Sequence, residues 1–407
     1  MNIQSYLHTP EGVRDIYNDE CARKLAVTDA VRRVFHRFGY EDIQTPPYEY
    51  AEIFDQESGS VDFRQMVKFF GSEGLTLVLR PDFTPSVARC VAKYYAEDQL
   101  PVRLCYEGNT FVSDASLRGR RAVHAQAGVE LVGDASPAAD AEIIAMVIQS
   151  LLETGLTDFQ IEVGEVGFFG GLLKEAGIQA QDEARLRDLI EKKNFFGVRE
   201  LAEKLIDDSE LREIFGRLPE LFGSFDQVIS SARRFCRNDT SREALDRLLE
   251  VGKFLSLYGV DQYVSLDLGM LGQYNYYTGI IFKGYTHSTG EPIVTGGRYD
   301  HLMSRFGRDC PAVGFAFSLD TLLAAMSRQK ITVRGFHPDC IILYEPDCVK
   351  EAIAEAMNRR IQGESVRLIC RDDSLTPDTC LQLAADSGIP QVWHFTSAGI
   401  TLLGGNE

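Results

Sequence analysis

The sequence contains no apolar run that approaches the length of about 18 residues that a membrane-spanning helix requires. Its N-terminus lacks a basic start followed by an apolar core, so we expect neither a secretory signal nor a membrane partner. The nine cysteines include no C-x-x-C pair, and an odd number at irregular spacing predicts reduced packing residues. A disulfide framework and a metal site are both disfavoured. These absences together predict a cytoplasmic protein with no metal and no cofactor.

Basic residues are also scarce, because 42 Lys and Arg stand against 60 Asp and Glu, for a formal net charge of -18. A large nucleic-acid partner is disfavoured, since phosphate contacts require clustered cations, although a local patch on an acidic protein can still bind RNA. The hydrophobic share of 44% and the charged share of 25% are typical of globular proteins. A length of 407 residues predicts two or three compact units.

The N-terminal third alternates helix and strand signals. Apolar residues recur on one helix face between 20 and 38, at Val27, Ala30, Val31, Val34, Phe35 and Phe38. Gly39 ends that pattern, and "YEDIQTPPYEY" reads as a short strand closed by two prolines. Two β-rich runs around residues 71–74 predict a hairpin. Thr84 and Pro85 are suitable N-cap and N1 residues, so Asp82 and Thr84 should lie where a strand passes into a helix.

The rest of the chain changes rhythm twice. Residues 103–132 read as two antiparallel strands joined by the basic loop "ASLRGRR", followed by a helix over 138–152 and the strand "FQIEVGE". A charged, helical stretch over about 178–258 predicts an insertion. Strands return until about 330, and residues 337–407 alternate strand and helix. We therefore expect a core over 1–330 and a small C-terminal α/β domain over 337–407.

Several motifs in a fixed order carry a family resemblance: "RPDFTPSVAR", "QAGVELVG", "YYTG", "GGRYD" and the glycine strand "AVGFAFSLD" before a helix. This order resembles the catalytic core of class II histidyl-tRNA synthetases over roughly residues 6–330. The resemblance implies an α+β fold, built on an antiparallel sheet with flanking helices, a helical insertion and the small C-terminal domain.

The resemblance also implies a histidine-binding pocket. Asp82 and Thr84 would lie near the α-ammonium group, while Glu130 and a tyrosine hydroxyl would bond the two imidazole nitrogens. Each residue taken alone is better explained as a polar strand residue satisfied inside the core, and only the ordered set favours the pocket. Its members are Asp82, Thr84, Gln126, Glu130, Tyr276, Tyr277 and Arg298.

The same motifs depart from the synthetase pattern where catalytic cations are expected. The second class II motif reads "FVSD", so Val112 stands at the arginine position and Asp114 at the glutamate position. Thr321 stands at the third-motif arginine, while Gly272 and Asn275 replace an arginine and an aspartate before the tyrosine pair. Since removing one such donor costs about 3 kcal/mol of transition-state stabilisation, we expect no amino-acid activation and no catalytic residues.

Three arginines remain in the basic loop, namely Arg118, Arg120 and Arg121. Arg120 aligns with a family arginine that can contact ATP. The three side chains either contact a phosphate or are simply solvated, and the solvated alternative is favoured.

A synthetase-like core that lacks these arginines and a long anticodon-binding domain resembles the regulatory subunits of ATP phosphoribosyltransferase. That resemblance implies a non-catalytic partner of a short-form catalytic subunit, acting in activation and histidine feedback inhibition, with L-histidine as possible effector. It also implies a homodimer within a hetero-oligomer, formed near the helix over 20–38. The alternatives are a histidine-tRNA ligase and a stand-alone synthetase-like binding protein.

Overall fold

A computed structural model describes residues 7–54, 61–71, 74–113, 121–271, 276–287, 289–372 and 374–404. The chain divides into two compact units, of which the first comprises Met1–Asp15 and Val27–Val333. The second comprises Ile16–Ala26 and Arg334–Glu407. The N-terminal half of the first helix therefore belongs to the second unit, which the sequence patterns do not anticipate.

The first unit is built on a nine-stranded sheet in the order β1-β5-β6-β12-β11-β10-β7-β9-β8. Its middle strands, from β5 to β7, pair antiparallel throughout, whereas β1 with β5 and β7 with β9 pair in parallel. This mixed sheet with its helices confirms the predicted α+β class. The strands are β1 Glu41–Asp42, β5 Val102–Phe111, β6 Val123–Val132, β7 Phe159–Glu165, β8 Phe222–Gly223, β9 Val264–Asp267, β10 Ile280–Thr286, β11 Val294–Arg298 and β12 Ala312–Ser318.

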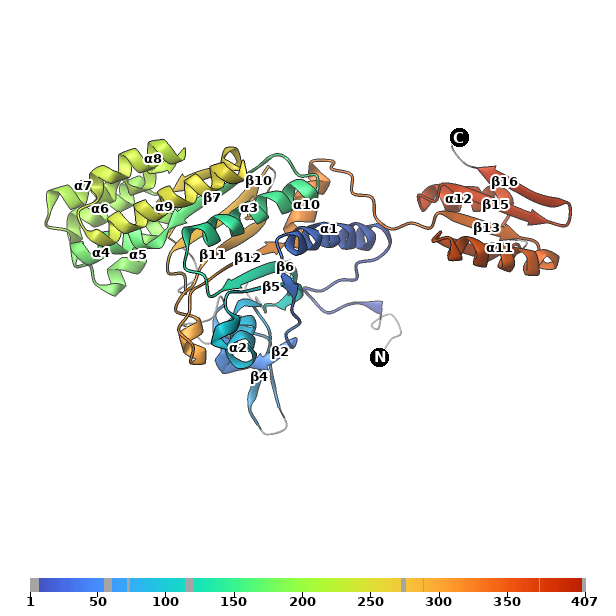
Figure 1. Ribbon diagram of the computed structural model, residues 1–407, viewed down its shortest axis with the longest axis horizontal. Helices are drawn as coiled ribbons and strands as arrows, with labels where there is room; N and C mark the ends of the chain where they lie inside the picture. The colour runs from blue at the N-terminus through green and yellow to red at the C-terminus, as the bar shows by residue number, and fades with distance from the viewer. Residues whose placement is uncertain are drawn as a thin grey trace. The chain divides into compact units, whose positions relative to one another are not determined.

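Alternation along β5 and β6 separates two apolar layers on the two faces of the sheet. Cys105 and Val129 join the larger core, to which α1 and α3 contribute, while Leu104 and Val132 pack with α2 on the opposite face. In Figure 1, α3 and α10 lie along one face of the sheet, apart from α2. The helices are α1 Asn18–Arg37, α2 Thr84–Tyr94, α3 Pro137–Glu153 and α10 Leu319–Arg328.

The helical stretch between β7 and β9 shares the larger core. Leu186, Phe215 and Leu248 are buried in the same apolar cluster as Val129, and α9 packs along α3 and α4 (Figure 1). This continuity makes the stretch part of the first unit. Its helices are α4 Val166–Ala176, α5 Ala180–Glu191, α6 Phe195–Leu205, α7 Ser209–Arg217, α8 Phe225–Ala232 and α9 Asp239–Tyr258.

A three-stranded antiparallel sheet precedes α2, in the order β2-β4-β3. It comprises β2 Tyr48–Tyr50, β3 Lys68–Phe70 and β4 Thr76–Leu79, and it contains the predicted hairpin. Tyr48, Tyr50 and Phe69 are 50%, 53% and 37% exposed, and the rings of Tyr48 and Phe69 meet edge to face at 5.6 Å. Aromatic side chains thus lie exposed on this small sheet.

The second unit contains a four-stranded sheet in the order β14-β13-β15-β16, in which only β16 runs antiparallel to its neighbour. Two separate apolar clusters, one with α11 and one with α12, pack on this sheet. Figure 1 shows both helices beside the strands. The alternation of strand and helix that the sequence predicts for residues 337–407 is present, and it ends in two successive strands. The elements are β13 Cys340–Tyr344, α11 Val349–Ile361, β14 Val366–Cys370, α12 Pro377–Asp386, β15 Gln391–Thr396 and β16 Gly399–Gly404.

All nine cysteines are free. Among the helices formed by the described residues, none combines the length and the apolar character needed to cross a membrane.

Candidate ligand-binding site

A cavity of about 170 Å³ lies against the face of β6, β11 and β12 that carries α2. Six of the seven residues that the sequence predicts for the pocket line it, from three separate parts of the chain. The lining consists of Val61, Pro81, Asp82, Thr84, Thr110, Val112, His124, Gln126, Glu130, Tyr276, Tyr277, Thr295, Gly297, Tyr299, Gly314, Phe315 and Ala316.

Glu130 is the most deeply buried acid of the cavity, with an exposed fraction of 1%. Its Oε1 accepts hydrogen bonds from the hydroxyls of Thr84, at 2.7 Å, and Tyr106, at 3.4 Å, and its Oε2 accepts one from the hydroxyl of Tyr299. Burial raises the pKa of Glu130 to about 8, although the bonds from Tyr299 and Thr84 favour the ionised form. A carboxyl with this pKa is largely protonated at neutral pH.

Thr84 corrects one sequence prediction. It is the first residue of α2 and not its N-cap, which is Phe83. Its hydroxyl donates to Glu130, so the side chain is directed to the cavity and does not cap the helix. Asp82 instead serves the turn, because its Oδ1 accepts a hydrogen bond of 3.2 Å from the backbone N–H of Thr84.

Three tyrosines form an aromatic wall beside Asp82. The ring of Tyr276 meets that of Tyr277 at 4.9 Å and that of Tyr299 at 6.0 Å, both edge to face. The hydroxyl of Tyr276 donates to Asp82 Oδ2 at 3.5 Å. Rings beside a carboxylate suit a ligand that has both an aromatic and a cationic part.

Two glycines provide the space for these side chains. A methyl group on Gly314, which pairs with Glu130 in the sheet, would overlap Glu130 Oε2 and lie 2.5 Å from the carbonyl oxygen of Val129. A methyl group on Gly297 would lie 2.7 Å from the ring of Tyr277. The glycines of "GGRYD" and "AVGFAFS" are therefore required by close side-chain approach.

Gln126 presents an unsatisfied acceptor to the cavity. It lies on β6 opposite Ser318, and its Oε1 is buried without a hydrogen-bond partner among the described residues. Since buried polar atoms are nearly always paired, this oxygen is a candidate acceptor for a donor on a ligand.

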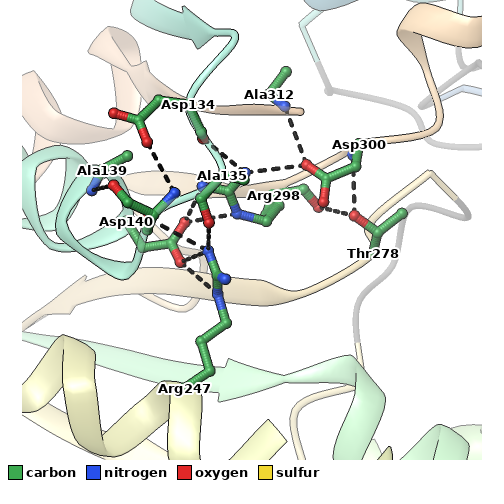
Figure 2. A network of polar contacts seen from close by, with 10 residues as sticks. Asp134, Ala135, Ala139, Asp140, Arg247, Thr278, Arg298, Asp300 and Ala312 are labelled. Atoms are coloured by element: carbon green, nitrogen blue, oxygen red, sulfur yellow. Dashed lines mark hydrogen bonds and ion pairs between the residues drawn. The ribbon is translucent and has the colours of Figure 1, made fainter. Parts of the chain in front are cut away.

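Arg298 lies outside the described lining of the cavity. Its guanidinium forms an ion pair of 2.7 Å with Asp140 on α3, one of 3.1 Å with Asp300, and a hydrogen bond to the carbonyl oxygen of Asp134. Arg247 on α9 binds the same Asp140 at 2.6 Å (Figure 2). Burial lowers the pKa of Arg298, but the attraction of Asp140 and Asp300 raises it above its ordinary value. Arg298 therefore fixes the end of β11 beside Tyr299.

A second, larger cavity of about 640 Å³ shares Val112 and His124 with the first. Arg121, one of the three loop arginines for which a phosphate contact is the less favoured alternative, lines this outer cavity and forms an ion pair of 2.7 Å with Asp320. Arg118 and Arg120 lie outside the described residues. The outer cavity also includes Thr321.

The positions expected to carry synthetase arginines can be followed in part. Val112 and Thr321 line the cavities without bringing a cation. Gly272, Asn275 and Asp114 fall outside the described residues.

Tyr106 and Tyr299 are site residues that the predicted pocket omits. Tyr299 belongs to the motif "GGRYD", whereas Tyr106 belongs to none of the motifs that carry the resemblance. Gly128, the neighbour of Tyr106 across the strand pair, leaves the space for its ring.

Within the described part of the chain, His36, Asp42 and Cys105 form a group whose potential metal ligands lie within 4.8 Å of one another. Both carboxylate oxygens of Asp42 accept hydrogen bonds from Arg32, at 2.8 and 2.7 Å. Burial raises the pKa of the Cys105 thiol to about 12, which disfavours the thiolate that a metal requires. These residues do not fit a metal ion.

The fold and the cavity define a protein of the class II aminoacyl-tRNA synthetase type, and the histidyl-tRNA synthetase family model matches residues 12–322. Among solved structures, histidyl-tRNA synthetase from Nostoc sp. PCC 7120 shares the fold at 20% identity, with a TM-score of 0.82 over 97% of this chain and 91% of that chain.

Closer relatives specify the family. The chain is 39% identical to the ATP phosphoribosyltransferase regulatory subunit of Acetivibrio thermocellus, over 89% of this chain and 86% of the relative. It is 42% identical to that of Ruminiclostridium cellulolyticum, over 87% and 85%. A crystal structure from Bacillus halodurans, described as an ATP phosphoribosyltransferase regulatory subunit/histidyl-tRNA synthetase, superposes with a TM-score of 0.84 at 31% identity, covering 95% and 97% of the two chains. The chain belongs to the family of ATP phosphoribosyltransferase regulatory subunits.

Proposed function

We propose that this chain is the non-catalytic regulatory subunit that assembles with a short-form ATP phosphoribosyltransferase catalytic subunit in the first step of histidine biosynthesis. In this role it activates the catalytic subunit and takes part in feedback inhibition by histidine. One observation carries the proposal: the cavity keeps an acid, an amide and an aromatic wall, while Val112 and Thr321 supply no cation for adenylate chemistry.

Regulation by histidine requires that histidine bind one state of the assembly better than another. We propose that Asp82, Thr84, Gln126, Glu130, Tyr276 and Tyr277 hold the effector, with the ring near Glu130 and the ammonium near Gln126 and Asp82. Arg298 supports this site indirectly, because its ion pair with Asp140 fixes the end of β11. Gln126 Oε1, which has no hydrogen-bond partner among the residues that the structure describes, favours a ligand that brings a donor.

We further propose a homodimer within the hetero-oligomer, formed close to α1 and the small sheet. The exposed aromatic face of Tyr48, Tyr50 and Phe69 supports this arrangement, because such patches commonly mark contacts between subunits.

Co-expression with the short-form catalytic subunit tests the assembly. We expect co-purification, and a phosphoribosyltransferase rate that rises on addition of this chain and falls again with histidine. ATP–pyrophosphate exchange with histidine should remain at background. Absence of both a complex and a rate change would refute the proposed function, and histidine-dependent exchange would favour the ligase alternative.

A further inference from the structure

The inner cavity is lined by acidic and neutral side chains. Its acidic groups are Asp82 and the largely protonated Glu130, and the described lining contains neither lysine nor arginine. His124 is the single imidazole among those residues. An α-amino acid presents both an ammonium and a carboxylate, and this lining matches only the first of the two charges.

Acceptors for an ammonium are present on the wall that β6 provides. Gln126 Oε1 is buried with no hydrogen-bond partner in the part of the chain that the structure describes, whereas both oxygens of Glu130 already accept bonds from hydroxyl groups. On this wall, the oxygen of Gln126 is therefore the acceptor that most requires a hydrogen-bond donor. An ammonium provides three donors and satisfies it directly.

The outer cavity does not supply the missing positive charge. Its described lining carries Arg121 and Arg328 against Glu291 and Asp320, so the formal charges cancel. Arg121 is held by Asp320 at 2.7 Å, and Asp320 also accepts a hydrogen bond from the backbone N–H of Ala125. A carboxylate that extended past Val112 would have to compete with Asp320 for Arg121.

We propose that this cavity recognises an imidazole-bearing primary amine through its ring and its ammonium group, and that it gives a ligand's carboxylate no net attraction. The imidazole part of this inference rests on the proposed function. Histidine, histidinamide and histamine then bind the isolated chain alike, because the groups that differ among them meet no cationic side chain among the described residues of the lining.

Titration calorimetry on the full-length chain at pH 7 tests the inference with four probes: L-histidine, L-histidinamide, histamine and imidazolelactate. We expect histidinamide and histamine to bind at least as tightly as histidine. Imidazolelactate, which keeps the carboxylate and lacks the ammonium, should bind at least about tenfold more weakly, since a charge-assisted hydrogen bond is lost.

A variant gives the converse test. Val112→Arg places a cation where the two cavities meet, and it should raise the affinity for histidine relative to histidinamide by about tenfold. Leu257→Arg adds the same charge at an exposed position on α9 and should leave the ratio unchanged. Circular dichroism verifies that both variants fold, and the comparison of ligands on the parent chain is independent of them.

Two results would overturn the inference. Binding of histidine about tenfold or more tighter than histidinamide would mean that a cation reaches the carboxylate. Failure of all four probes to bind would remove the cavity as an amine site. Neither result affects co-purification with the catalytic subunit, so failure here is distinct from failure of the proposed assembly.

Discussion

The hydroxyl of Tyr299, the residue after β11, donates a hydrogen bond to Glu130 Oε2 on β6, although β11 and β6 are not neighbours in the sheet. Strand β12 runs between β6 and β11, and Gly314 of β12 pairs directly with Glu130. The bond can cross the intervening strand because Gly314 has no side chain in its path. The single glycine at position 314 therefore allows the hydrogen bond between Tyr299 and Glu130 to form.

Replacement of Gly314 by alanine tests this relationship. The added methyl group would overlap Glu130 Oε2, so Gly314→Ala should lower the free energy of unfolding by about 3 kcal/mol. Gly170→Ala, in helix α4, is the matched control, because nothing lies within 4 Å of its added methyl group. Alanine is the better helix former, so the control should be neutral or stabilising by up to about 1 kcal/mol. Denaturant unfolding measures both variants, and equal losses would contradict the steric argument.

The buried carboxyl of Glu130 predicts a pH dependence of stability. Its pKa is raised from an ordinary value of 4.5 to about 8, so between these values the folded state binds more protons than the unfolded chain. This group therefore makes the protein less stable as pH rises from about 4.5 to about 8. Glu130→Gln resembles the protonated form and should flatten this part of the profile.

The control for this experiment is Glu107→Gln, which removes an exposed carboxyl from β5. Unfolding free energies at pH 5, 6.5 and 8 should follow the parent in the control and decline less with pH in Glu130→Gln. A decline as steep as that of the parent would show that another group titrates.

Asp140 should be essential to the first unit. It is fully buried between Arg298 and Arg247 and joins α3 to β11 and α9 (Figure 2). Asp140→Ala would leave two guanidiniums without their shared counter-charge and should cost about 3 to 5 kcal/mol of stability. Asp239→Ala breaks an exposed pair with Arg242 and should cost less than about 0.5 kcal/mol. Similar thermal melting of the two variants would refute this role.

The exposed aromatic face of the small sheet predicts the proposed homodimer. Tyr50→Glu would bring a charge to that face, and light scattering after gel filtration should detect a shift from dimer to monomer. Phe196→Glu changes an aromatic residue that is 86% exposed on α6 and should leave the dimer intact. A Tyr50→Glu chain that remains dimeric would exclude this face as the contact.

Local patterns predicted much of the fold because helix and strand periodicities are written in neighbouring residues. The helix over 20–38, the hairpin around 71–74 and the two strands over 103–132 correspond to α1, to β3 with β4, and to β5 with β6. Thr84 was misassigned as an N-cap, since its hydroxyl is used by Glu130, which lies 46 residues further along the chain.

The sequence by itself determined the order of elements, the motifs that indicate the family, and the residue types of the pocket, because these depend on short-range spacing. Only the tertiary structure decided which of these side chains contact one another. It brought Tyr106 and Tyr299 to Glu130, turned Arg298 towards Asp140, and paired Arg121 with Asp320. Such pairings join residues that are distant in the chain. The burial that raises the pKa of Glu130 likewise arises only when the strands and helices pack around its side chain, with glycines leaving the space for it.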